Sequence, residues 1–446
     1  MIKARLCLFL TAIVTAAAVG GCDTSSSAEA PIATEAEPVT SLPPVTSTTT
    51  TTNTSTTTTT TTTTLPPTYD LTGAVVAPDG SGLTGATVTV GDTTTTTDSS
   101  GEFSFEAIAP GPLTVTRPGW LSTEIEWTGD AQPAAITLEP RIVRALRVSS
   151  YVAADRTQFE ALLDLADASS VNALVFDTKD ESSYVLYESN SPFAASIGSA
   201  NPMYDPVELI GAAKERDLYT ITRIVTFEDD LWTRERPDHK LAGYWIDPTI
   251  EEAWEYPLEL AVEACELGFD EIQFDYVRFP AGQTAAVAQR KKPLTETERV
   301  AAIGAFLTEA KARLHPLGCP LSADIFAIVL SSSDDQGIGQ RPEDVSAIVD
   351  ALSPMIYPSH YSDGWLGFPK PNDHPGPVVA DALDDGIPRL VDNTLMRPWL
   401  QAFYYNGSQV LAEIAEAEER GVGWILWNAG GNYAESWLPP AREEKQ

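Results

Sequence analysis

Cysteine, histidine and positive charge are scarce in this sequence of 446 residues. It has four cysteines and four histidines, and no Cys-x-x-Cys pair, so a thiolate or multi-histidine metal site has little material to work with. We therefore expect neither a metal nor a cofactor. Lys and Arg total 28 against 63 Asp and Glu, which gives a net charge of −35. Because nucleic acids and anionic membrane surfaces carry charge of the same sign, this balance argues against both as partners.

The sequence also has no apolar run long enough to span a bilayer, and its longest apolar run lies at the N-terminus. Lys3 and Arg5 precede an apolar run over residues 6–19, which is too short to span a bilayer and has the layout of a secretory signal. The run ends at Val19-Gly20-Gly21-Cys22, which resembles a bacterial lipobox. We expect residues 1–22 to be a lipoprotein signal peptide and Cys22 to carry the lipid, which would hold the protein on the outer side of the cell membrane. The alternative is a plain secretory signal with an incidental cysteine.

Residues 23–67 are rich in Ser, Thr, Ala and Pro, with an almost unbroken threonine tract over 46–64. So few apolar side chains do not offset the entropy cost of ordering the backbone, and we expect a disordered linker. Its predicted role is to hold the folded part away from the membrane.

Short alternating runs separated by Gly, Pro and Asp mark residues 68–140 and predict a small all-β sandwich. The order of Gly85-Ala86-Thr87-Val88, the segment 97–103 and Pro110-Gly111 resembles carboxypeptidase regulatory-like (prealbumin-like) domains. That resemblance implies a spacer or a weak binding module. We favour the spacer, because no cluster of exposed aromatic residues marks a sugar-binding face.

From residue 141 to 440, apolar β-rich runs alternate with helical patterns, which predicts parallel strands covered by helices. Helix starts are visible at Asp205-Pro206 and at Thr295, three residues before Glu298, and glycines 268 and 421 stop helices before strands. Eight runs fit a (β/α)8 barrel, an α/β fold, better than an open sheet. The predicted strands cover residues 145–152, 172–178, 218–227, 270–279, 320–329, 351–357, 397–403 and 422–428.

Two cysteines, Cys265 and Cys319, remain after the signal segment, and the strand order places both at the lower rim of adjacent barrel units. In an exported protein they fit either a disulfide bridge or two separately buried thiols.

In such barrels the working residues lie at the carboxyl ends of the strands and in the loops that follow. Strand four ends Phe274-Asp275-Tyr276-Val277-Arg278, and strand five carries Asp324 inside an apolar run. Burying an unpaired charge is costly, so Asp324 must meet a partner or face a polar cavity. Strands two, three and six add Asp177, Lys179, Arg223, Tyr357 and His360 to this end of the barrel.

The segments FDTKD, GFDEIQFDYVRFP, SADIF, SPMIYPSHY, RPWLQAF and GWILWNA occur in this order between residues 144 and 437. Together they resemble the DUF4015 family, which is named for its similarity to glycoside hydrolases. The resemblance implies a barrel related to those enzymes, but no particular substrate.

Glycosidic cleavage needs one carboxylate as nucleophile or base and one protonated carboxyl as acid. By similarity to the strand-four aspartate of amylase-like barrels, we expect Asp275 to be the nucleophile or base, facing a sugar in an open cleft. Arg278 or Arg223 would keep it ionised. Asp324 is the candidate acid, Asp177 the second candidate, and Asp247 in the loop after strand three a further one.

Other polar and aromatic residues near the strand ends are candidates for binding a sugar. Asp177, Lys179 and Arg223 are equally compatible with a structural ion-pair network, and His360 with a role in its own loop. The aromatic candidates are Trp245, Tyr276, Tyr357, Tyr361, Trp399 and Trp427, of which Tyr357 and Trp427 are preferred. The predicted substrate-binding set is Lys179, Arg223, Asp247, Tyr276, Arg278, Tyr357, His360, Trp427 and Asn428.

Three functional hypotheses follow. The first is a cofactor-free enzyme that hydrolyses O-glycosidic bonds of a polysaccharide. The second is a non-catalytic carbohydrate-binding lipoprotein on the cell surface. The third is a metal-assisted enzyme that uses Asp177, Asp180 and Asp247, because these carboxylates share the same rim.

Overall fold

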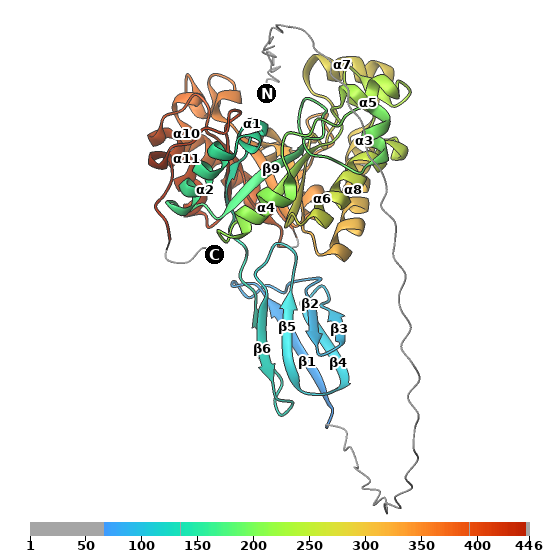
Figure 1. Ribbon diagram of the computed structural model, residues 1–446, viewed down its shortest axis with the longest axis vertical. Helices are drawn as coiled ribbons and strands as arrows, with labels where there is room; N and C mark the ends of the chain where they lie inside the picture. Colours follow the sequence, from blue (N-terminus) through green and yellow to red (C-terminus); the bar gives the residue numbers. More distant parts are fainter. Residues whose placement is uncertain (1–66, 134, 392, 443–446) are drawn as a thin grey trace, which may run out of the picture. The chain divides into compact units, whose positions relative to one another are not determined.

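The computed structural model describes residues 67–133, 135–391 and 393–442, which form an antiparallel β-domain followed along the chain by a barrel (Figure 1). The expected signal peptide, Cys22 and the threonine tract lie outside the described residues. No helix in the described part of the chain is both long enough and apolar enough to cross a membrane.

Seven short strands form the first domain, in two sheets with the orders β4-β1-β7 and β3-β2-β5-β6. Buried and exposed positions alternate along β4, where Phe103 and Phe105 point into the core while Glu102 and Ser104 are exposed. The predicted all-β sandwich is confirmed. Its strands are β1 (Tyr69–Val76), β2 (Thr87–Val90), β3 (Thr93–Thr96), β4 (Glu102–Ile108), β5 (Gly111–Thr116), β6 (Thr123–Trp127) and β7 (Ile136–Thr137).

The second domain is a closed barrel of eight parallel strands, and its first strand pairs with both the second and the eighth. The closing contact joins β14 to β15, so the sheet has no free edge at that point. This confirms the predicted (β/α)8 barrel. Its strands in chain order are β8 (Arg144–Arg147), β9 (Ala173–Lys179), β10 (Tyr219–Val225), β13 (Glu271–Asp275), β14 (Leu321–Phe326), β15 (Ala351–Ile356), β17 (Trp399–Gln401) and β18 (Trp424–Trp427), with the two-residue β16 (Leu395–Met396) beside β15.

Helices surround the barrel (Figure 1). Two of the predicted helix starts have the expected geometry: the Asp205 carboxylate accepts hydrogen bonds from the first turn of α4, and Thr295 and Glu298 form a reciprocal capping box at α8. The helices are α1 (Ser150–Ala154), α2 (Arg156–Asp167), α3 (Pro192–Ile197), α4 (Pro206–Lys214), α5 (Asp230–Glu235), α6 (Glu255–Leu267), α7 (Gly282–Lys291), α8 (Glu296–Leu314), α9 (Pro342–Ser346), α10 (Pro375–Gly386) and α11 (Gly407–Glu419). A small hairpin of β11 (Lys240–Ala242) and β12 (Trp245–Ile246) lies in the loop after β10.

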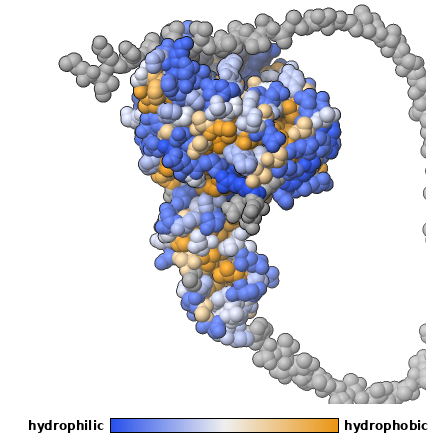
Figure 2. Space-filling model, turned by 90° about the vertical axis from the view of Figure 1, so that its left-hand side faces the viewer, coloured by the Kyte–Doolittle hydropathy of each residue, from blue (hydrophilic) through white to orange (hydrophobic). Residues whose placement is uncertain are grey.

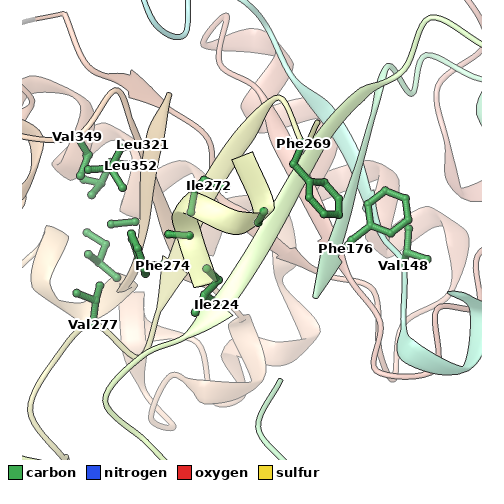
Figure 3. Close-up of a cluster of buried hydrophobic side chains, with 14 of the residues drawn as sticks. Val148, Phe176, Ile224, Phe269, Ile272, Phe274, Val277, Leu321, Val349 and Leu352 are labelled. Atoms are coloured by element: carbon green, nitrogen blue, oxygen red, sulfur yellow. The ribbon is translucent and has the colours of Figure 1, made fainter. Parts of the chain in front are cut away.

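The main apolar core lies between the outer faces of the strands and the helices. Phe274 of β13 packs edge-on against Phe306 of α8, with ring centroids 5.1 Å apart. Phe176 of β9 similarly meets Phe269, at 5.6 Å, and Figure 3 shows these side chains among neighbouring aliphatic ones. On the outside, apolar side chains show as patches among hydrophilic ones (Figure 2). Because the outward-facing side chains of the strands form this core, the inward-facing side chains can be more polar.

Some element boundaries differ from the prediction. The first strand was expected to run to residue 152, but β8 ends at Arg147, because the Ser149 hydroxyl caps α1 and accepts the Val152 N–H. The fifth strand ends at Phe326, and a 3-10 turn over Ala327–Leu330 follows it. After β18, the described residues contain only the 3-10 turn Glu435–Trp437.

Cys265, near the end of α6, and Cys319, just before β14, form a disulfide, with Cα atoms 6.2 Å apart. The alternative of two separate thiols is therefore wrong.

Candidate active site

The carboxyl-terminal end of the barrel holds a buried cluster of acidic and basic side chains centred on Arg223. Arg223 lies on β10, between β9 and β13, and its backbone is in register with Asp177 on one side and Gln273 on the other. Parallel strands point their carboxyl ends the same way, so Arg223 reaches acidic groups on both neighbours. The positions of Arg223, Asp177 and Asp275 follow directly from this register.

The Arg223 guanidinium donates to three carboxylates. Nη1 lies 2.9 Å from Asp177 Oδ1, while Nε and Nη2 lie 2.9 and 2.6 Å from Asp275 Oδ2. Nη2 also pairs with Glu181. Arg147 of β8 completes the cluster by donating from Nη2 to Asp177 Oδ2 at 2.6 Å. Of the two cations proposed to keep Asp275 ionised, Arg223 is therefore the one in contact.

Asp275 is held firmly and is more enclosed than the sequence led us to expect. Its side chain is 5% exposed. Oδ1 accepts the N–H of Tyr276 at 2.5 Å, and Tyr276 has a φ of +52°, a left-handed conformation that is strained for a residue with a side chain. The open cleft expected at Asp275 is therefore not found: this carboxylate is almost completely buried and faces Arg223.

Asp324 lies on β14 and is completely buried. Oδ1 accepts the Trp399 Nε1–H at 2.8 Å, whereas Oδ2 has no hydrogen-bond partner among the described residues and lies 3.8 Å from Arg223 Nε. Burial, and then the charge of Asp275, raise the pKa of Asp324 well above its usual value. Both effects favour the protonated form of Asp324, which is how a buried acid avoids the cost of ionisation.

Lys179 and Asp247 were predicted to bind substrate, but both are buried and have protein partners. Lys179 Nζ lies 2.6 Å from Asp229 Oδ2, so Lys179 is not part of the network that joins Asp177 to Arg223. Asp247 accepts from Lys292 and from Thr249. The three carboxylates of the metal-assisted hypothesis are also engaged separately, since Asp180 accepts from Ser182. Among the described residues, no three His, Cys, Asp or Glu side chains are grouped as metal ligands.

The preferred sugar platforms, Trp427 and Tyr357, also have protein neighbours. The Arg147 and Arg223 guanidinium carbons lie 4.2 and 5.0 Å from the centroid of the Trp427 ring, which makes Trp427 a cation–π partner of the cluster. Tyr357 is buried and packs edge-on against His360 and Phe403, with ring centroids 5.3 and 5.4 Å apart. His360 itself is exposed.

Two other residues of the predicted set, Asn428 and Arg278, serve mainly to shape the rim. Asn428 donates from Nδ2 to the Ala402 carbonyl oxygen at 2.7 Å and so ties the end of β18 to that of β17. Arg278 is buried and does not pair with Asp275. Its guanidinium lies over three aromatic rings, those of Trp245, Tyr276 and Phe326.

The sequence reasoning missed several residues at this end of the barrel. Arg147 was taken as part of an apolar strand. Glu181 directly follows the FDTKD segment, and Glu228 lies in the loop after β10; both are acidic residues just beyond strand ends, which is the signal that would have found them. Three exposed tyrosines in the segments after β8, β10 and β17 were also missed: Tyr151 of α1, Tyr244 and Tyr404, at 72, 57 and 91% exposure.

Comparisons with known proteins show that two segments of this chain match known families. Residues 70–139 match the carboxypeptidase regulatory-like domain, as predicted. Residues 145–433 match DUF4015, the family described as "Putative glycosyl hydrolase domain". A comparison with curated proteins gave no match.

Solved structures similar to this chain include a hypothetical protein from Ruminiclostridium thermocellum, 31% identical, which covers 40% of this chain and 96% of its own with a TM-score of 0.36. The PgaB (BpsB) glycoside hydrolase domain from Bordetella bronchiseptica is 12% identical over 65% of this chain and 95% of its own, with a TM-score of 0.48. A chitinase from Chromobacterium violaceum is 14% identical over 66% of this chain and 96% of its own, with a TM-score of 0.41. Because the DUF4015 match spans most of the chain, this protein belongs to the DUF4015 family of glycosyl hydrolase domains.

Proposed function

We propose that the barrel hydrolyses O-glycosidic bonds of a polysaccharide, with Asp275 as nucleophile or general base. The observation that carries this proposal is the bond pattern of Asp275, whose Oδ2 accepts two hydrogen bonds from Arg223 at the carboxyl-terminal end of the barrel. A guanidinium in that position favours the ionised carboxylate that the chemistry requires. Membership of a glycosyl hydrolase domain family supports the reaction class.

The proposed reaction requires a charged Asp275 and a neutral Asp324, and the surroundings of each residue favour that form. A neutral Asp324 beside a charged Asp275 adds no repulsion to the nucleophile, and the pair thus differs in the way expected of two carboxyls with different roles. Asp324 was the predicted acid, but its complete burial keeps it from direct contact with a substrate unless the rim opens. In this proposal its part is to remain neutral and to leave Arg223 to Asp275.

The exposed tyrosines support a polymer as substrate. Tyr151, in α1, and Tyr244 and Tyr404, in loops, all follow barrel strands and therefore lie at the end of the barrel that holds Asp275. Exposed aromatic rings stack on the apolar faces of sugars, and three of them around one rim suit several sugar units at once.

The proposed location is the outer side of the cell membrane, through a lipid on Cys22. The disulfide between Cys265 and Cys319 supports export, because such bonds persist in oxidising compartments. Labelling cells with a radioactive fatty acid tests the anchor directly: Cys22→Ser is expected to lose the label and to appear in the medium.

Release of reducing sugar from a glycan panel tests the reaction. Asp275→Asn is expected to abolish hydrolysis while keeping most of the binding, since the amide retains the shape but neither attacks carbon nor accepts a proton. Asp217→Asn is the matched control, because Asp217 is exposed at the opposite end of β10. If the wild type binds oligosaccharides but cleaves none of the panel, the surface receptor is the correct function and the hydrolase is not.

A further inference from the structure

The half-buried glutamate after β10, Glu228, occupies a defined position next to Asp275. The backbone N–H of Thr226 donates to the carbonyl of Asp275 at 2.9 Å, and that of Phe227 donates to the carbonyl of Tyr276 at 3.2 Å. Glu228 is the next residue along the chain. It therefore lies in the loop just beyond the end of β10, the strand that pairs with the one carrying Asp275.

The other side of the Glu228 backbone is fixed by the β11–β12 hairpin. Asp229 N–H donates to the Tyr244 carbonyl and Ile246 N–H to the Phe227 carbonyl, both at 2.8 Å. This is the pattern around a non-hydrogen-bonded antiparallel pair, so Glu228 and Trp245 face each other with their side chains on the same side. The Trp245 ring in turn contacts the Tyr276 ring, at 5.9 Å, and the Arg278 guanidinium, at 4.5 Å. The Glu228 side chain thus lies in the rim around Asp275.

The carboxyl of Glu228 is free to donate a proton, unlike those of Asp177, Glu181 and Asp324. Within the described part of the chain, no hydrogen bond or ion pair holds it, and it is partly exposed. By contrast Asp177 is held between two arginines, Glu181 by one, and Asp324 is sealed. A group that gives a proton to a bound glycan needs both access to the glycan and freedom from a fixed cation.

The charges around Glu228 favour its protonated form. The pKa of Glu228 is raised overall, and burial is the largest cause. The charges of Glu181 and Asp275 also raise this pKa, whereas those of Arg278 and Lys179 lower it. For Glu181, burial acts in the raising direction, but Arg223 and Arg147 bring its pKa below the usual value. Two glutamates at one rim are therefore biased towards opposite protonation states, which is the arrangement that separates an acid from a base.

We propose that Glu228 is the catalytic residue that protonates the leaving oxygen of the glycosidic bond; this rests on the hydrolase function proposed above. As the bond between the anomeric carbon and the glycosidic oxygen breaks, the Glu228 proton moves to that oxygen. The new bond to the anomeric carbon comes either from Asp275, with water displacing it in a second step while Glu228 takes the water proton, or from a water that Asp275 deprotonates. Either route consumes one water. The two-step route returns both carboxyls to their starting states directly, whereas the one-step route does so after Asp275 loses and Glu228 regains a proton by exchange with solvent.

Glu228→Gln tests the assignment with two kinds of substrate. On polysaccharide, kcat/KM is expected to fall by about 10²–10⁴-fold, the usual contribution of general acid catalysis. On a 2,4-dinitrophenyl glycoside of the same sugar, the loss is expected to be far smaller, because that leaving group needs no proton. The alkaline limb of the kcat/KM profile on polysaccharide should disappear with the carboxyl. Turnover of the dinitrophenyl glycoside also reports that the variant has folded.

Asp238→Asn is the control, because Asp238 lies in the same loop and its side chain is 78% exposed; its activity on both substrates should match that of the wild type. An active wild type together with a Glu228→Gln variant that keeps both its rate on polysaccharide and its alkaline limb would overturn the assignment of Glu228 alone. The same holds if Asp324→Asn, rather than Glu228→Gln, shows the leaving-group signature. A wild type that cleaves neither chitin, chitosan, cellulose, xylan, α-glucan nor peptidoglycan, nor any of the dinitrophenyl glycosides, overturns the hydrolase proposal and the acid with it.

Discussion

Buried acidic and basic side chains form ion pairs at both ends of the barrel interior, but the number of acids for each base differs between the two ends. At the amino-terminal end, Glu271 of β13 pairs with Arg397, one acid with one base. Both oxygens of Glu271 are also hydrogen-bonded to neutral groups: Ser322 donates to one at 2.5 Å and Tyr219 to the other at 3.2 Å. At the carboxyl-terminal end, two arginines serve Asp177, Asp275 and Glu181, and Asp324 has an oxygen without a partner.

The difference indicates which end carries function. A carboxylate whose charge and lone pairs are all matched by protein groups has nothing left for a ligand, and its loss is felt as stability. An excess of acids over bases, with strained backbone at Tyr276 and partly exposed glutamates, is costly to keep and is found where chemistry needs it. The comparison therefore predicts that changes at the two ends separate into effects on activity and effects on stability.

Arg223→Met is expected to have the largest effect, because it leaves Asp177 and Asp275 without their shared cation. Loss of this electrostatic support should lower kcat/KM by about 10²–10³-fold. The free energy of unfolding at neutral pH should fall by roughly 3–5 kcal/mol, the cost of breaking a buried pair. Without the cation, burial disfavours the ionised forms of these carboxyls, so the penalty should be absent below about pH 4 and grow as the pH rises. Urea unfolding at several pH values measures it; a penalty that does not change with pH would contradict this explanation.

Arg397→Met makes the corresponding change at the other end. It too should lower the free energy of unfolding by about 3–5 kcal/mol, because Glu271 is left buried and charged. The kcat/KM of the folded fraction should stay at the wild-type value. The double variant Arg397→Met, Glu271→Leu should recover most of the lost stability, because it removes both charges together. If activity falls in the single variant although the protein is folded, the two ends do not divide function and stability as argued.

The fold was predictable because it rests on local signals. The helix start at Thr295 and the eight apolar runs depend on residues close together in sequence, and each was found near its predicted place. The first strand was overestimated because the Ser149 cap, which ends it, is a weaker signal than the apolar run. In the site, the position of each residue on its strand was enough to predict that Asp275, Arg223 and Asp177 lie close together.

Partners and exposure were not predictable in the same way. Lys179 was grouped with Asp177, two residues before it on the same strand, yet its charge is matched by Asp229 from the loop after the next strand. The enclosure of Asp275 and the availability of Glu228 both depend on how the hairpin with Trp245 folds over the rim. Such contacts join segments far apart in sequence, and no local periodicity encodes them.

The disulfide offers a third change outside the carboxyl-terminal cluster, with a smaller effect. It closes a loop of 54 residues between α6 and β14. Cys265→Ser together with Cys319→Ser should lower the free energy of unfolding by about 2–4 kcal/mol, mainly by freeing the unfolded chain. Hydrolysis at 25 °C should be unchanged, because Cys265 lies near the end of α6 and Cys319 just before β14, whereas Asp275 lies at the carboxyl end of β13. Reduction of the wild type with dithiothreitol should reproduce the loss in Tm, and a loss of activity without unfolding would place the bridge in the functional part of the barrel.

Asp324→Asn tests the buried carboxyl of the carboxyl-terminal end, and near pH 5 its expected effect, up to about 1.4 kcal/mol, is the smallest of the four. A carboxyl whose pKa is raised by folding binds its proton more tightly in the folded state, so it lowers stability as the pH rises above its unfolded pKa. Asparagine keeps the acceptor for Trp399 Nε1–H but has no proton to lose. Above about pH 4, the variant should therefore gain stability relative to the wild type, by up to about 1.4 kcal/mol per pH unit until the folded pKa is reached. Asp363→Asn, at an exposed position, should show no such trend. If the Asp324 variant instead loses stability relative to the wild type as the pH rises, Asp324 is ionised in the fold and takes part in the charge network of Arg223.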